Sequence, residues 1–114
     1  MDDDYSVRLA DFEGWVESEG DEIRGVILLE AEEEHLWIDN VAVDPAFAGR
    51  GIGATLLDVA VRRASELALS EVHLFTHELM ADNRRIYEHL GWIEYEPDEP
   101  LADFFVYFRK RSSA

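Results

Sequence analysis

The chain has 114 residues, 47% of them apolar, which is the size of one domain able to bury a core without disulfides or metals. Its 26 acidic and 10 basic residues give a formal net charge of −16, a surface that repels nucleic-acid backbones and anionic lipids. It contains no cysteine, no basic leader after Met1 and no apolar run near the ~20 residues that cross a bilayer. We therefore expect a cytoplasmic, single domain over residues 1–114, with neither a nucleic-acid nor a membrane partner.

The first predicted elements form a β-hairpin. Residues 12–17 and 23–31 are rich in β-branched and aromatic side chains, and a turn cluster, SEGD at 18–21, separates them. After an acidic turn at 30–34, residues 36–43 (LWIDNVAV) predict a third strand. Asp44-Pro45 ends this strand, because proline has no amide hydrogen for the ladder and restricts the residue before it.

A glycine-rich loop at 49–53 then leads into the clearest helical pattern of the chain. From Ala54 onward, apolar residues recur at the i, i+3, i+4, i+7 spacing of a helix face: Leu56, Leu57, Ala60, Ala64, Leu67 and Ala68. Asp58, Arg62 and Glu66 stand four apart and predict the solvent face. The pattern indicates a helix that packs one side on a sheet.

The rest of the chain alternates again between strand and helix. Residues 71–76 predict a short strand, residues 81–90 a second helix closed by Gly91, and residues 92–96 and 101–110 two further strands. The order of three strands, helix, strand, helix and two strands is typical of the α/β (α+β) class. We expect a mixed, mostly antiparallel twisted sheet of about six strands with helices packed on it.

The glycine loop has the composition of a phosphate site. Gly49, Gly51 and Gly53 allow positive φ and a close approach of backbone to a ligand. The first-turn amides of the following helix have no intrahelical acceptor and lie at the positive end of the helix dipole. We therefore predict a pyrophosphate cradle there, assisted by Arg50. The alternative is a tight turn without a ligand, for which one glycine would suffice.

Residues 49–54 also satisfy the dinucleotide pattern G-x-G-x-x-A, which raises a nicotinamide-binding fragment as an alternative. That fingerprint follows its strand at once within a long βαβαβ unit, whereas five residues here separate Val43 from the loop and one strand-helix pair follows. A Walker A loop is excluded, because no Gly-Lys-Ser/Thr follows. The context of the loop therefore argues against both a dinucleotide fingerprint and a Walker A loop.

Two sequence blocks resemble the GNAT superfamily of acyl-CoA-dependent N-acetyltransferases. The first is VDP at 43–45 followed by GRGIG at 49–53, which is similar to the family's pyrophosphate loop. The second is NRRIYEHLGW at 83–92, similar to the family's asparagine, tyrosine and Leu-Gly-aromatic signature. The resemblance covers about residues 12–109. It implies a GNAT-like fold and acetyl transfer from acetyl-CoA, as co-substrate, to an amine.

The resemblance also implies roles for particular residues. Tyr87 is the candidate general acid toward the CoA sulfur, and Asn83, one helical turn earlier, faces the same way. The residues expected to bind the cofactor are Val41, Ala42, Val43, Gly49, Arg50, Gly51, Gly53, Ala54, Asn83 and Tyr87. For the general base, Asp39 and His77 are the candidates, followed by Glu34, because all three lie near where the family opens its strands for the acceptor. A water relay is the other possibility.

The chain departs from the family in two places. Ala48 stands where the family usually has Gln or Arg, and only about a dozen residues precede the first hairpin strand, where relatives carry a strand and helices that wall the acceptor site. A non-catalytic acyl-CoA sensor or assembly module is therefore the alternative function. An exposed acceptor side also favours a homodimer.

The charge and the histidines complete the predictions. The acidic surface is either an adaptation for solubility, as at high salt, or a field that attracts a cationic acceptor, whether a small molecule or a peptide amine. His73 and His77 lie four apart on a predicted strand, about 13 Å from each other, which is too far for one metal ion. We expect no metal site.

Overall fold

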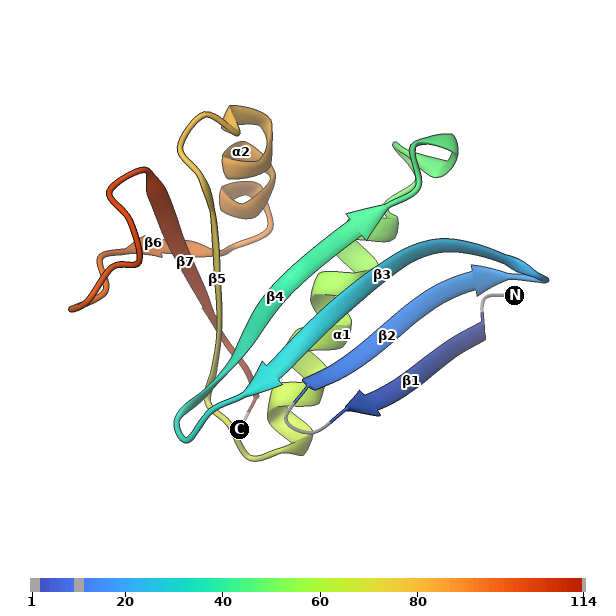
Figure 1. The fold of residues 1–114 in the computed structure, drawn as a ribbon, viewed down its shortest axis with the longest axis horizontal. Coiled ribbons are helices and arrows are strands. Elements are labelled where there is room, and N and C mark those ends of the chain that lie inside the picture. The colour runs from blue at the N-terminus through green and yellow to red at the C-terminus, as the bar shows by residue number, and fades with distance from the viewer. Residues whose placement is uncertain (1–2, 10–11, 114) are drawn as a thin grey trace.

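The computed structural model describes residues 3–9 and 12–113, and these form one twisted sheet with two α-helices on it. Figure 1 shows the strands in the order β1-β2-β3-β4-β5-β7-β6, of which only the β4–β5 pair is parallel. The elements are β1 (Asp3–Leu9), β2 (Phe12–Glu19), β3 (Glu22–Ala31), β4 (His35–Val43), η1 (Pro45–Phe47), α1 (Ile52–Glu66), β5 (Glu71–His77), α2 (Ala81–His89), β6 (Ile93–Tyr95) and β7 (Phe105–Arg111). The predicted mixed, mostly antiparallel sheet is confirmed.

The predicted hairpin is confirmed, with a tighter turn than expected. β2 and β3 extend to Glu19 and Glu22, so Gly20 and Asp21 alone connect them, and Gly20 has a φ of 61° that favours glycine. Of the acidic segment predicted as a turn, Glu30 still belongs to β3, and only residues 32–34 turn.

Strand β1 was not predicted, although Tyr5, Val7 and Leu9 alternate with Ser6 and Arg8 as in a strand. The segment is a strand through its neighbour: it pairs with β2 from Asp3↔Ser18 to Leu9↔Phe12. Two residues therefore separate the paired ends of β1 and β2 in the chain, which leaves no length for helices between these strands.

The end of the chain is less regular than predicted. β6 has three residues, and β7 begins at Phe105 rather than at residue 101. Residues 101–104 use their backbone groups elsewhere, because Leu101 donates its amide to the Tyr107 hydroxyl (2.8 Å) and Phe104 accepts from the Glu78 amide (2.8 Å). The ladder that the sequence pattern predicted cannot form with these groups already bonded.

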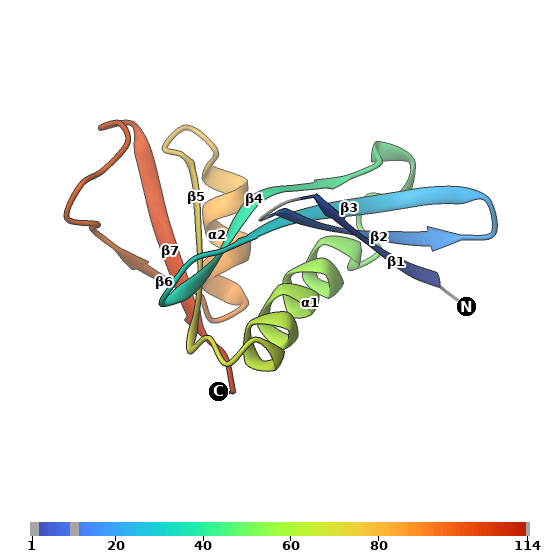
Figure 2. The same ribbon diagram turned by 60° about the horizontal axis from the view of Figure 1, so that its bottom comes forward.

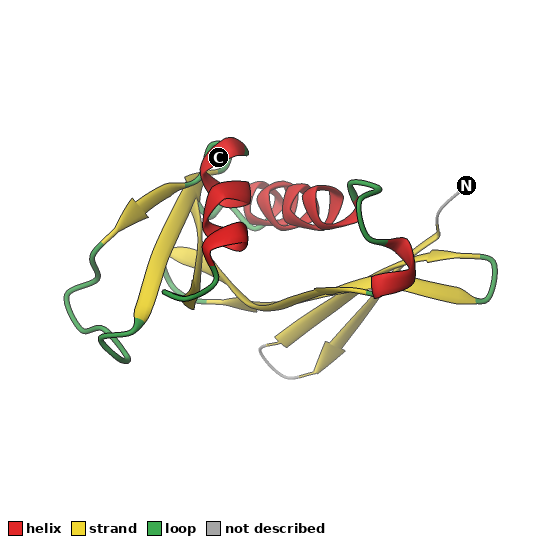
Figure 3. Ribbon diagram, turned by 90° about the horizontal axis from the view of Figure 1, so that it is seen from above, coloured by secondary structure: helices red, strands yellow, loops and turns green. Residues whose placement is uncertain are grey.

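Helix α1 begins two residues before its predicted start and ends at Glu66. Leu67 caps it, and Ala68 follows at φ 60° with an exposed side chain, so Ala68 is not part of the buried helix face. Figures 2 and 3 show α1 and α2 on the same face of the sheet. The core lies between them and the sheet, and includes Ile27, Leu29, Leu36, Leu56, Leu57, Ala60, Ala64, Val72, Leu74, Tyr87, Trp92 and Phe108.

Helix α1 approaches β3 closely at Gly25. A Cβ atom there would lie 2.9 Å from both Ile52 Cγ2 and Leu56 Cδ1 and 3.2 Å from the Ala42 carbonyl oxygen. We predict that Gly25→Ala lowers the free energy of unfolding by about 1–3 kcal/mol, the usual cost of overpacking a core. Urea unfolding measures this as a lower midpoint with an unchanged slope.

Gly53→Ala is the matched control for Gly25→Ala, because its Cβ would meet only Val43 Cγ2 at an ordinary 3.7 Å within helix α1. We expect this variant to keep the stability of the parent or gain up to about 1 kcal/mol. A Gly25→Ala protein as stable as Gly53→Ala would show that α1 can move away from the sheet at no cost.

The parallel strands β4 and β5 diverge after a short contact. They pair only from His35↔Glu71 to Trp37↔His73, although β4 continues to Val43 and β5 to His77 (Figure 1). On its other edge β4 stays paired with β3 as far as Val43. The β5-facing edge of β4 beyond Trp37 therefore has no partner strand among the described residues.

Candidate functional site

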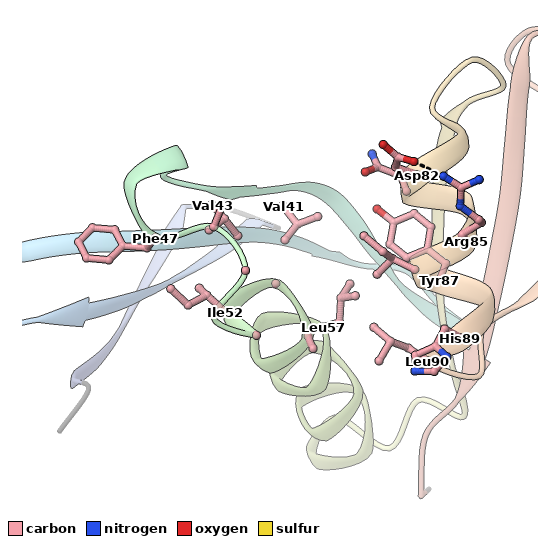
Figure 4. Close-up of a pocket in the computed structure, with 17 residues that line it drawn as sticks. Val41, Val43, Phe47, Ile52, Leu57, Asp82, Arg85, Tyr87, His89 and Leu90 are labelled. Carbon is pink, nitrogen blue, oxygen red and sulfur yellow. Dashed lines mark hydrogen bonds and ion pairs between the residues drawn. The ribbon is translucent and has the colours of Figure 1, made fainter.

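A groove of about 890 Å³ occupies the space between β4, the glycine loop, α1 and α2. Figure 4 shows it from the side. Its lining residues are Val41, Val43, Phe47, Ala48, Gly49, Gly51, Ile52, Gly53, Ala54, Leu57, Asp82, Asn83, Arg85, Ile86, Tyr87, His89 and Leu90. The two sequence blocks that resemble GNAT motifs thus lie on opposite walls of one groove.

The loop wall is formed by a short turn followed by glycines in the left-handed region. Asp44 Oδ1 accepts a hydrogen bond from the Ala46 amide (2.9 Å), which holds η1 at the end of β4. Gly49 and Gly51 then have φ values of 78° and 77°, and a Cβ atom on either would meet nothing within 4 Å. The backbone here borders open space and needs glycine for its conformation.

The start of α1 exposes amides without a cap. The first helical bond runs from the Thr55 amide to the Gly51 carbonyl (3.0 Å), so the amides before Thr55 have no acceptor within the helix. Gly51 provides no side-chain cap, and the first turn has no acidic residue. This end of the groove therefore favours an anion.

The opposite wall presents the predicted tyrosine. Figure 4 shows the Tyr87 ring pointing from α2 toward Val41 on β4. The ring is held on its buried side by Phe108 and Trp92, with centroid distances of 5.4 and 6.3 Å. No described residue hydrogen-bonds its hydroxyl, and burial raises the pKa of Tyr87 above its usual 10. The phenol is protonated at neutral pH and free to donate.

Helix α2 adds wall residues that the sequence analysis did not name. Asn83, Ile86, Tyr87 and Leu90 line the groove at i, i+3, i+4 and i+7. This spacing is a helix face, so extending the pattern from Asn83 and Tyr87 could have found the other two. On the loop side, Phe47, Ile52 and Leu57 were likewise missed.

Two of the predicted cofactor residues do not line the groove with their side chains. Ala42 is exposed and lies between Val41 and Val43, so alternation along β4 points it to the other face. Arg50 has its guanidinium over the Phe47 ring, 5.3 Å from the centroid. Arg50 is thus beside the groove entrance rather than in it.

The candidate bases lie outside the groove. Asp39 is on β4, where the register with β3 shifts and leaves it opposite no residue, and partial burial followed by Glu30 and Glu32 raises its pKa. His77 Nδ1 accepts a hydrogen bond from the Leu79 amide (3.1 Å), and its ring stacks on Phe104. Glu34 is an exposed residue of the turn between β3 and β4. The structure brings none of the three into the groove wall.

A hydrogen-bonded histidine network joins β5 to β6. His73 bonds the Tyr95 hydroxyl through Nδ1 (2.7 Å) and Glu71 through Nε2 (2.8 Å), and His35 stacks on it at 3.9 Å. Burial lowers the pKa of His73, and the bond to His73 lowers the pKa of Glu71. No group of three or more potential metal ligands occurs in the part of the chain that the structure describes.

These shifts predict a loss of stability in mild acid. Because the pKa of His73 is lower in the folded state, the unfolded chain binds this proton first as the pH falls below the usual histidine value of 6.5, whereas the lowered pKa of Glu71 acts only below its usual 4.5. Stability is therefore present at pH 7 and declines toward pH 5, by at most about 1.4 kcal/mol per pH unit for one proton. His73→Gln should decline less between these pH values in urea unfolding. An equal decline in both proteins would exclude His73 as a contributor.

No described helix has the length and apolarity to cross a membrane. The sequence model described as "Acetyltransferase (GNAT) family" matches residues 2–92. Among curated proteins, no significant sequence match was found.

Solved structures with the same fold include several acetyltransferases. A GNAT family acetyltransferase from Elizabethkingia anophelis with acetyl-CoA bound has a TM-score of 0.78 at 19% identity, over 89% of this chain and 76% of that one. The Bacillus subtilis acetyltransferase in complex with CoA has a TM-score of 0.76 at 18% identity, over 90% and 78%. The ribosomal-protein-S18-alanine N-acetyltransferase from Escherichia coli has 0.78 at 18% identity, over 94% and 74%. These similarities confirm the GNAT-like fold.

Proposed function

Since the chain belongs to the GNAT acetyltransferase family, we propose that it moves an acetyl group from acetyl-CoA to a primary amine by direct attack of the amine on the thioester. One observation supports this most: a single groove joins an uncapped helix N-terminus to a buried tyrosine whose hydroxyl has no described partner. The free amides of the helix N-terminus can bind a diphosphate, and the tyrosine hydroxyl can donate a proton to a departing thiolate. Residues 1–114 act as one acetyltransferase domain in this proposal.

The glycine loop binds the pyrophosphate of the coenzyme. The residues assigned to this role are Gly49, Arg50, Gly51, Gly53 and Ala54, with Arg50 approaching from the entrance. The pantetheine arm follows the β5-facing edge of β4 at Val41, Ala42 and Val43, where no described strand pairs with the backbone. Asn83 bonds the arm from α2. In a protein of net charge −16, backbone dipoles provide most of the attraction for the phosphates.

The reaction needs a base, an oxyanion donor and an acid. The base takes a proton from the ammonium, and the neutral amine then attacks the thioester carbon. An amide of residues 41–43 donates to the resulting oxyanion, a contribution of about 3 kcal/mol in comparable sites. As the C–S bond breaks, its electron pair stays on sulfur and Tyr87 donates its hydroxyl proton to the leaving thiolate. The extra proton on the nitrogen of the tetrahedral intermediate then passes to the Tyr87 oxygen, directly or through water, which restores the phenol and gives the neutral amide.

We assign the base to Asp39 rather than to His77. The raised pKa of Asp39 makes its carboxylate a better proton acceptor near neutral pH. His77 Nδ1 already accepts the Leu79 amide hydrogen, so this lone pair is directed at the backbone rather than at an acceptor amine. A water relay remains the route if Asp39→Asn leaves the rate unchanged.

A non-catalytic acyl-CoA sensor is the second candidate, because the chain between β1 and β2 has no helices to wall the acceptor side and Ala48 replaces the usual polar residue of the loop. Both functions predict that acetyl-CoA raises the melting temperature, by the equivalent of ~2.7 kcal/mol at a hundredfold excess over its Kd. Release of CoA thiol with a panel of small amines, polyamines and lysine peptides separates them. Release supports the enzyme, and binding without release on any amine supports the sensor.

The proposal includes the setting of the enzyme. The acidic surface favours a cationic acceptor, and the absence of cysteine favours a cytoplasmic protein. A homodimer would cover the free edge of β1 together with the exposed Ile23 and Leu28 of β3. Sedimentation equilibrium tests the dimer, which requires twice the mass of 13.1 kDa.

A further inference from the structure

The face of the sheet opposite the helices is built from aromatic rings in its β4–β5–β7–β6 half. Strand register places Trp37, Phe75 and Tyr107 side by side, with centroid distances of 6.2 Å from Trp37 to Phe75 and 5.7 Å from Phe75 to Tyr107. Further rings contact these three in a continuous series. We call the whole set the aromatic surface: His35, Trp37, His73, Phe75, His77, Tyr95, Phe104, Phe105 and Tyr107.

The aromatic surface is open on its outer side. Both helices lie on the other face of the sheet (Figures 2 and 3), although Tyr107 and His73 are themselves buried by neighbouring residues. Trp37, Phe75 and Phe105 are half-buried, and Phe104 is 45% exposed. Ring faces and edges that would fill a core in a larger protein are therefore accessible to a ligand.

Carboxylates surround these rings. Glu30 pairs with Trp37 across the strands and shares its face, and Asp39 lies within electrostatic range of both Glu30 and Glu32. Asp103 borders a small cavity of about 290 Å³ together with Phe105 and Tyr107. Arg109 lies over the Tyr95 ring, 5.2 Å from the centroid, and Arg109 and Arg111 both lie within electrostatic range of Glu71 at the start of β5. The part of the surface around Trp37 and Phe75 thus combines electron-rich rings with the negative charge of nearby carboxylates.

The part of the aromatic surface around Trp37 and Phe75 also adjoins the gap between β4 and β5. Trp37 is the last β4 residue paired with β5, and Phe75 follows on the β5 side of the gap. The groove approaches the same gap from the helix face through Val41 and Val43. A molecule resting on Trp37 and Phe75 therefore lies across the sheet from the predicted thioester.

From these features we propose that the aromatic surface selects the acceptor, and that the acceptor is a small organic ammonium with an alkyl or aryl body, its charge over the Trp37 and Phe75 rings. A cation over a ring face is stabilised by the ring quadrupole, and the apolar body replaces water on the neighbouring rings. The surrounding carboxylates exclude anionic acceptors. The catalytic part of this inference rests on the proposed acetyltransferase function, whereas the binding part does not.

Choline and its uncharged isostere 3,3-dimethylbutan-1-ol test the binding part in the wild-type protein. Neither has an amine that can be acetylated, so the assay is independent of turnover. We expect choline to shift the Trp37 indole signal in NMR titrations with a Kd at least fivefold below that of the alcohol. Equal affinities, or no shift at Trp37 with either probe, would overturn the proposal.

Phe75→Leu removes one ring and keeps an apolar side chain. We expect it to weaken choline binding at least fivefold, to change alcohol binding less than twofold and to leave the Kd of CoA unchanged. Phe12→Leu is the matched control, because Phe12 is an exposed ring on the same face, two strands away from Trp37, and should leave choline binding unchanged. Equal losses in the two variants would overturn the proposal. So would conversion of a dimer to a monomer by Phe75→Leu, because the surface would then be a subunit interface.

Kinetics separate this inference from the proposed function. With acetyl-CoA and 2-phenylethylamine, Phe75→Leu should raise the KM of the amine at least fivefold with kcat within twofold. Thiol release without a preference for cationic, apolar amines would support the enzyme and overturn the selection by the aromatic surface. Selective choline binding without any thiol release would support the surface as a cation site and overturn the acetyltransferase proposal.

Discussion

Replacing Tyr87 by Phe should lower kcat about 100-fold and leave the Kd of CoA unchanged. The substitution removes one oxygen atom, and general acids contribute about 10²–10⁴ to a rate. The ring contacts with Phe108 and Trp92 stay in place, and the hydroxyl makes no described hydrogen bond whose loss would destabilise the fold. Thiol-release kinetics at saturating acetyl-CoA measure the loss, and calorimetry measures CoA binding.

The pH profile provides the control for the role of Tyr87. Because burial raises its pKa, the phenol remains protonated through neutral pH, and the limb of the rate profile that belongs to the acid lies above pH 10. The Phe variant should lose this upper limb while it keeps the lower one, which we assign to Asp39. An unchanged kcat in the variant would remove Tyr87 from the acid role and leave proton transfer to water.

Local sequence signals predicted the glycine loop and its helix well. Proline at 45 ends a strand, glycines at 49 and 51 adopt positive φ, and the apolar spacing from Leu56 to Ala64 marks the buried face of α1. Each of these signals acts within a few residues, so the sequence alone can report it. The same holds for Gly91, which follows the C-cap of α2 and has a φ of 90°.

Features that depend on register could not be predicted in this way. Strand β1 pairs with β2, and although Tyr5, Val7 and Leu9 alternate with polar residues, the segment alone does not indicate which strand it joins or in which register. Trp37, Phe75 and Tyr107 belong to three separate strands and meet only because β4 pairs with β5 and β5 with β7. The acceptor side was therefore less predictable than the coenzyme side, whose residues follow one another along the chain.

Gly51→Ala should weaken CoA binding about tenfold or more. Gly51 has a φ of 77°, where a side chain costs roughly 1–2 kcal/mol, so alanine favours a different backbone conformation. That change turns the amides at the start of α1 away from the groove, and the added methyl group borders the space that the pyrophosphate requires. Calorimetry with CoA gives the change in Kd, and urea unfolding gives the accompanying loss of stability.

Gly20→Ala separates the effect on the ligand from the effect on the fold. Gly20 has a φ of 61° and, like Gly51, open space where a Cβ atom would stand, but it lies in the β2–β3 turn rather than in the groove wall. Both variants should lose a similar 1–2 kcal/mol of stability, since both place alanine in the left-handed region. Only Gly51→Ala should lose affinity for CoA. If the two proteins bound CoA equally well, the backbone of the glycine loop would not hold the diphosphate, and the assignment of the groove to acetyl-CoA would fail with it.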